Sequence, residues 1–222
     1  MKELAPGLLQ LRGFRDAINV YLAEDVLIDA ATKLARRRIL TQIERRPVSL
    51  VALTHAHPDH QGSAKAVCDA RAIPLACHTD DVAVMEGRAP MEQPHPGHPI
   101  HRLQHAFWTG PPHPVARPLT EGDEVAGFRV VHAPGHSPGE VIYFRDSDRV
   151  AICGDVVNNV DFLTGRTRVG EPPGIFTPDP ELNRASIRKL AELEPSLVCP
   201  GHGPPFSDLD GLQRLIAGFQ GP

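Results

Sequence analysis

Three histidines and one aspartate fall within a single stretch of six residues, and this stretch most constrains what the chain can fold into. It reads His55-Ala56-His57-Pro58-Asp59-His60, and it follows a largely apolar run at residues 48–53. Such a run predicts a buried strand. Gln61-Gly62-Ser63 come next and allow a helix to begin. The sequence therefore predicts a strand that ends in a polar loop, with a helix behind it.

The spacing of these side chains indicates a metal site. His55 and His57 are two residues apart, so both rings point the same way if the backbone is extended. Asp59 and His60 can then face an adjacent point once the chain turns. Imidazole and carboxylate groups together suit zinc, and also iron or manganese. The alternative is a histidine-rich surface loop without a ligand.

Three further motifs follow in the second half of the chain. His136 lies in the turn Pro134-Gly135-His136-Ser137-Pro138-Gly139, Asp155 ends Cys153-Gly154-Asp155, and His202 lies in Pro200-Gly201-His202-Gly203. Each motif is weak alone, but each places a metal-ligating residue just after an apolar run. Their order along the chain adds to the evidence from the first motif.

With these motifs in this order, the sequence resembles the metallo-β-lactamase superfamily of metal-dependent hydrolases over residues 8–219. The resemblance implies an α/β fold, a four-layer αβ/βα sandwich of two mixed β-sheets flanked by helices. It also implies two divalent metal ions, most readily Zn²⁺, with Fe or Mn as options. The implied ligands are His55, His57 and His136 for one ion, Asp59, His60 and His202 for the other, and Asp155 as a bridge.

Hydrophobic patterning taken alone predicts only an α/β protein. Strands are expected at 8–11, 17–23, 25–29, 48–53, 74–77, 127–132, 139–145, 149–153 and 196–199. Helices are expected at 32–45, 63–72, 80–86, 180–193 and 208–219, with Leu34, Ile39, Leu40, Ile43, Leu182, Ile187 and Leu190 facing inward. The length of 222 residues fits one domain, 1–222. Every candidate ligand follows a strand, where open α/β sheets place their ligands.

Asp29 ends an apolar strand, where packing alone would not favour a carboxylate. The family resemblance implies that this aspartate supports the metal site from behind the ligands. The other interpretation is an N-cap for the helix that follows, and the two roles are compatible.

A segment rich in proline and histidine, residues 87–118, separates the two halves. Its proline density predicts irregular structure over most of its length. Long irregular loops in compact proteins are often lids or binding loops. We therefore expect this loop to cover the metal pocket, with Phe107 and Trp108 against the substrate. Packing of these two aromatic rings onto the body of the protein is the alternative.

Composition narrows the possible partners and the cellular compartment. A net charge of −4 gives no basic surface for nucleic acid. No run approaches about 18 apolar residues, so no membrane span is expected. Residues 1–11 show no secretory signal. Four cysteines without CxxC spacing are expected as buried thiols, with a disulfide as the minority option. These features predict a cytoplasmic protein that acts on a small molecule; they leave the oligomeric state open.

The resemblance implies a hydrolase in which a water bound to two metals attacks a small thioester, lactone or related ester. Asp59 would be the catalytic residue that orients this water. Glyoxalase II enzymes share the first motif but carry a further C-terminal domain, for which little chain follows His202. β-Lactam hydrolysis is not expected, because Asp155 fits the bridged hydrolase pattern and no export signal is evident. The alternative function is a persulfide dioxygenase with a single iron.

Overall fold

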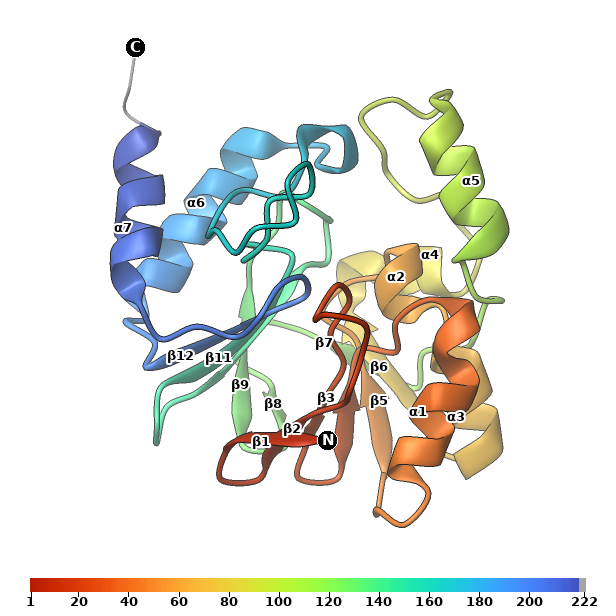
Figure 1. Ribbon diagram of the computed structural model, residues 1–222. Coiled ribbons are helices and arrows are strands. Elements are labelled where there is room, and N and C mark those ends of the chain that lie inside the picture. The colour runs from red at the N-terminus through yellow and green to blue at the C-terminus, as the bar shows by residue number, and fades with distance from the viewer. Residues whose placement is uncertain (220–222) are drawn as a thin grey trace.

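The computed structural model describes residues 1–219 and contains two β-sheets that face each other (Figure 1). The first sheet has seven strands in sequence order: β1 Lys2–Ala5, β2 Leu8–Gln10, β3 Tyr21–Ala23, β4 Val26–Ile28, β5 Leu50–Ala52, β6 Leu75–His78 and β7 Arg117–Leu119. The second has five: β8 Glu124–Val125, β9 Phe128–His132, β10 Val141–Arg145, β11 Val150–Gly154 and β12 Leu197–Pro200.

Both sheets mix antiparallel and parallel pairing. In the first, β1 to β4 are antiparallel neighbours and β4 to β7 are parallel neighbours. In the second, β8 to β11 are antiparallel and only β12 is added in parallel, beside β11. The parallel pairs bring the carboxyl ends of several strands to one edge of each sheet, which is where the polar loops begin.

Helical segments cover the outer faces and the upper edge of the sheets. They are η1 Lys33–Ala35, α1 Arg36–Ile43, α2 Pro58–Gln61, α3 Ala64–Arg71, η2 Thr79–Asp81, α4 Val82–Met85, α5 Pro99–Phe107, η3 Gly174–Phe176, α6 Pro180–Glu192 and α7 Leu209–Gly218. Helices α1 and α3 flank the first sheet, and α6 and α7 flank the second (Figure 1). Among residues 1–219, no helix is both long enough and apolar enough to cross a bilayer.

Side-chain alternation along the strands creates the four layers. In β4, Ile28 points into the core between the sheets, and Leu27 points into the core beneath α1 and α3. On β11, Ile152 likewise faces the central core, while Cys153 faces the core shared with α6 and α7. Each sheet is therefore buried on both faces, which explains why its strands read as continuous apolar runs.

Several expectations from the sequence need correction. The proline-rich segment contains a helix, α5, which begins at Pro99 and has His98 as its N-cap, since His98 Nδ1 accepts from the Ile100 N–H. Leu34 and Leu182 were predicted to face inward, but they are 71% and 42% exposed. The short strand β1 and the bridge strand β8 were not predicted.

Two further expectations concern polar and sulfur-containing residues. The carboxylate of Asp29 does not cap a helix, because the N-cap of η1 is Thr32 and that of α1 is Ala35. The four cysteines are buried free thiols, as predicted. Burial raises the pKa of each of them, and that of Cys68 reaches about 12.

Candidate metal centre

The seven predicted ligands meet in one place, between the carboxyl edges of the two sheets. The loop after β5 supplies His55, His57, Asp59 and His60, and the loops after β9, β11 and β12 supply His136, Asp155 and His202. Six of the seven side chains are at most 8% exposed. Asp59, in the first turn of α2, is the more accessible one, with 14% of its side chain exposed.

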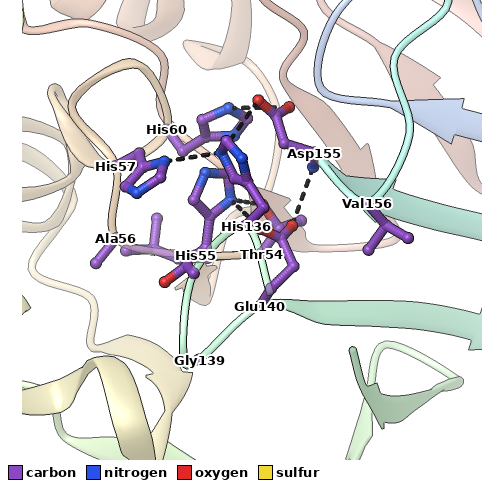
Figure 2. Close-up of polar contacts among 12 residues, drawn as sticks. Thr54, His55, Ala56, His57, His60, His136, Gly139, Glu140, Asp155 and Val156 are labelled. Carbon is purple, nitrogen blue, oxygen red and sulfur yellow. Dashed lines mark hydrogen bonds and ion pairs between the residues drawn. The ribbon is translucent and has the colours of Figure 1, made fainter. Parts of the chain in front are cut away.

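These side chains form three overlapping groups, each compact enough to hold a metal ion. The groups are His55 with His57 and His136, His55 with His60 and Asp155, and Asp59 with His60 and His202; in each, the ligand atoms lie within 4.8 Å of one another. His57 Nδ1 lies 2.9 Å from His136 Nε2 (Figure 2). Asp155 lies between the groups, with Oδ2 3.5 Å from His136 Nε2 and 3.2 Å from His202 Nε2.

The hydrogen bonding around the cluster fits metal ions. His55 Nε2, His60 Nε2 and Asp155 Oδ1 are buried and make no hydrogen bond in the described chain, although His60 Nε2 and Asp155 Oδ1 lie at an ion-pair distance of 3.5 Å from each other. Buried polar atoms are nearly always satisfied, so these three atoms of one compact group are suited to coordinate a metal ion. Imidazole nitrogen and carboxylate oxygen are the donors that zinc and related transition metals accept. The residues therefore fit two divalent ions.

Acidic side chains lie beside the Nδ1 atoms of His60 and His55. His60 Nδ1 lies 2.9 Å from Asp29 Oδ2. His55 Nδ1 lies 3.1 Å from Thr54 Oγ1 and 3.2 Å from Glu140 Oε2, and burial raises the pKa of Glu140 well above its usual range. Glu140 also accepts a hydrogen bond of 3.0 Å from the Asp155 N–H (Figure 2). A carboxylate on Nδ1 fixes the tautomer that leaves Nε2 free for a metal. Each half of the cluster thus has one supporting carboxylate.

Uncharged acceptors hold two other rings. His136 Nδ1 lies 3.2 Å from Thr177 Oγ1, and His202 Nδ1 contacts the carbonyl oxygen of Ala17. The loop of His202 approaches the cluster closely because residue 201 is glycine: an added Cβ there would lie 2.2 Å from Asp155 Oδ1. A larger residue would therefore displace the Asp155 carboxylate.

Asp81 connects the two loops that carry His57 and His136. Its carboxylate accepts from the Ala56 N–H at 2.7 Å, from the Ser137 hydroxyl at 2.8 Å and from the Gly139 N–H at 3.0 Å. Asp81 is 1% exposed. One buried side chain therefore fixes the spacing between a loop of the first sheet and a loop of the second.

The environment keeps three of the histidines neutral. Burial lowers the pKa of His55, His57 and His136, and the neighbouring imidazoles lower it further. For His136 the pKa falls to about 4, although the charge of Asp155 opposes the shift. Neutral imidazole is the form that binds a metal ion. The first group is therefore ready to accept a cation at neutral pH.

The second group is more strongly charged. Burial opposes the protonation of His202, but Asp155 and Asp59 outweigh it and raise the pKa of His202 to about 10. Burial also opposes the ionisation of Asp59, yet the hydrogen bond to His202 and the charge of His60 bring the pKa of Asp59 to about 2. A metal ion entering here would replace protons as the partner of these carboxylates.

A separate group of His78, Asp80 and His132 also brings three metal-ligating side chains together. The two imidazole rings are stacked at a centroid distance of 4.0 Å. His132 Nε2 lies 2.8 Å from the carbonyl oxygen of Pro138, and His78 Nδ1 accepts from the Asp80 N–H. Because these nitrogens have protein partners, the group fits a structural role.

Three supporting residues were not predicted from the sequence: Glu140, Asp81 and Thr177. Glu140 could have been found from the sequence, because it is an ionisable residue next to a strand whose other members are apolar. Asp81 and Thr177 lie in segments whose sequence gives no indication of what they contact. Phe107 is 56% exposed, and its predicted contact with the substrate stays a prediction.

Comparison with known proteins agrees with this architecture. Residues 13–202 match the metallo-beta-lactamase superfamily family model. The chain is 29% identical over 220 residues to the probable metallo-hydrolase YflN of Bacillus subtilis, covering 86% of this chain and 82% of the relative. Relatives of the same organism include a second probable metallo-hydrolase, YybB, which is 30% identical over 69% of this chain and 63% of the relative.

Solved structures share the fold. TTHA1623 in a di-iron-bound form superposes with a TM-score of 0.68 and 31% identity, covering 93% of this chain and 98% of that one. The BLEG-1 B3 metallo-beta-lactamase gives a TM-score of 0.68 and 28% identity, covering 94% and 99%. The predicted arrangement of two mixed sheets flanked by helices is confirmed. The chain therefore belongs to the metallo-β-lactamase superfamily and is a metallo-hydrolase.

Proposed function

We propose that this metallo-hydrolase binds two divalent metal ions, most readily zinc, and hydrolyses a small thioester, lactone or related ester. The observation that carries the proposal is the compact group of His55, His60 and Asp155, with buried atoms that make no hydrogen bond in the described chain. The ligand set proposed from the sequence is His55, His57, Asp59, His60, His136, Asp155 and His202. Two ions are supported by the overlapping groups and by the di-iron form of a relative with the same fold.

Two metal ions held here would lower the pKa of a bound water and polarise the carbonyl group of the substrate. Hydrolysis joins the oxygen of water to the carbonyl carbon and breaks the bond from that carbon to the leaving oxygen or sulfur. One proton must move from the water to the leaving group. Asp59 is placed to carry it, because its carboxylate is partly exposed and lies 3.2 Å from His202 Nε2.

Several features of the chain prepare the site for this reaction. The supporting carboxylates of Asp29 and Glu140 orient two imidazoles, and Asp81 keeps the two sides of the cluster at a fixed distance. Such pre-organisation places reactive groups without rearrangement during the reaction. It also accounts for the number of buried polar groups in a region that would otherwise be apolar.

The test combines metal analysis with a substrate panel. Freshly purified protein is quantified for metal and then assayed with thioesters, lactones, phosphodiesters and β-lactams. We expect two ions per chain and turnover confined to the thioesters and lactones. Asp155→Ala should lose both metal and activity, whereas Asp69→Asn, on an exposed ion pair with Lys65, should lose neither. Saturation with one iron, together with oxygen consumption, would instead identify the persulfide dioxygenase alternative.

A further inference from the structure

A cavity of about 830 Å³ lies beside the metal centre, between α4 and the segment that follows α5. Its volume is within the range of binding sites for small organic molecules. Most of its wall is hydrocarbon, contributed by side chains that include Val84, Met85, Pro90, Met91, Pro111 and Pro112. The proline-rich segment thus contributes to a binding cavity, although neither Phe107 nor Trp108 lines it.

This cavity continues toward the metal centre. A second cavity of about 200 Å³ is lined by His57 and by Ser137, which follows His136. The two cavities share Ala56, Val84, Pro90 and Met91 as lining residues. A linear molecule could therefore extend from His57 past Val84 and into the larger cavity.

The two cations Lys33 and Arg88 on the wall of the larger cavity already have partners, and the smaller cavity is lined by the acidic residues Asp80, Asp81 and Glu92. The Lys33 ammonium donates a hydrogen bond of 2.6 Å to the carbonyl oxygen of Ala106. The Arg88 guanidinium forms an ion pair of 2.6 Å with Glu86. Neither cation needs an anionic ligand, so the cavity favours an uncharged chain.

We propose that this cavity binds the acyl chain of the substrate, and that the chain is aliphatic and uncharged. The scissile carbonyl would lie at the His57 end, and the far end of the chain would lie against Met85, Pro111 and Pro112. This inference rests on the proposed hydrolase function, because it assigns the acyl half of the ester or thioester to one side of the metal centre.

The first experiment measures chain-length preference in metal-loaded protein with thioesters from acetyl to decanoyl. Val84 lines both cavities, so Val84→Phe should obstruct the passage between them. We expect the ratio of kcat/KM for decanoyl over acetyl thioester to fall at least about tenfold, the scale of two buried methylene groups. Val84→Ala should not lower this ratio. Leu182→Phe adds a ring at an exposed position on α6 and should leave it unchanged.

Binding of the acid product separates this inference from the proposed function. Equilibrium dialysis with labelled decanoate should show binding to the wild type that is at least about tenfold weaker in Val84→Phe. If no ester is hydrolysed but this binding pattern holds, the hydrolase proposal fails and the cavity assignment stands. If esters are hydrolysed with a chain-length ratio that Val84→Phe does not change, and decanoate does not bind, the cavity assignment is wrong.

Discussion

Replacing Glu140 with glutamine should weaken metal binding without weakening the fold. Glu140 is fully buried; Oε1 accepts from the Asp155 N–H at 3.0 Å, and Oε2 lies 3.2 Å from His55 Nδ1. Glutamine keeps the volume, and its carbonyl oxygen can still accept from Asp155. Its amide NH₂ group must then face His55 Nδ1. When His55 Nε2 binds a metal, Nδ1 carries a proton, so two donors would meet.

The size of the effect follows from the interaction that is lost. When two buried donors face each other, one of them is left unsatisfied at a cost of about 1–3 kcal/mol, and each 1.4 kcal/mol is about a factor of ten in affinity. Glu140→Gln should therefore weaken the metal site that includes His55 by about 5- to 150-fold. The free energy of unfolding of the metal-free protein should change by no more than about 1 kcal/mol, because the volume and the bond to Asp155 are retained.

Competition with a chromophoric zinc chelator measures the dissociation constants of the first and the second zinc ion. Asp29→Asn provides a matched comparison, because Asp29 supports His60 in the same way at the other side of the cluster. We expect each variant to weaken one of the two binding steps more than the other. Unchanged zinc affinity at both steps in Glu140→Gln would show that the carboxylate of Glu140 does not support the site.

Three other predictions concern the ligands, the connecting carboxylate and the thiols. Asp59→Asn should lower kcat at least about 100-fold at unchanged metal content and melting temperature, as expected for a lost proton carrier. Steady-state kinetics together with metal analysis test this prediction. A loss of kcat of only a few fold would exclude the role of Asp59 as proton carrier. Asp81→Ala leaves three buried donors unpaired and should lower the free energy of unfolding by about 3–6 kcal/mol in denaturant titrations. A loss below about 1 kcal/mol would contradict the role of Asp81 in connecting the loops of His57 and His136. The four cysteines should resist a thiol reagent at neutral pH until the protein unfolds, because burial both covers them and raises each pKa; rapid labelling of the native protein would contradict their burial.

Local sequence was enough to predict the strand–loop arrangement that carries the candidate ligands. The run before His55 is apolar because β5 is buried on both faces. His57 has an extended backbone, and it joins His55 in one group of candidate ligands. The later residues His136, Asp155 and His202 were found because each follows an apolar strand. That they meet in space depends on the pairing of the strands, which hydrophobic patterning alone does not determine.

Features that depend on three-dimensional contacts were missed. Proline density predicted irregular structure around α5, but Pro99 lies at the first helical position, where its missing N–H costs nothing. Leu34 and Leu182 fit an amphipathic pattern, yet η1, which holds Leu34, has no buried residue, and the buried positions of α6 are Asn183, Ser186, Ile187 and Leu190. Asp81 supports residues 25 and 56 positions away, so no local pattern could indicate its role.

The contact between His202 and Ala17 has a consequence for the order of assembly during synthesis. These residues are 185 positions apart, and Asn19 and Tyr21 also donate hydrogen bonds to Pro200, just before His202. The last ligand is thus held by a loop from the start of the chain. A ribosome-bound chain can display His55 to His60 long before His202 emerges. Contacts of such high sequence separation form slowly. The first ion can therefore be captured by a nascent chain, whereas the second must wait for the two ends to meet.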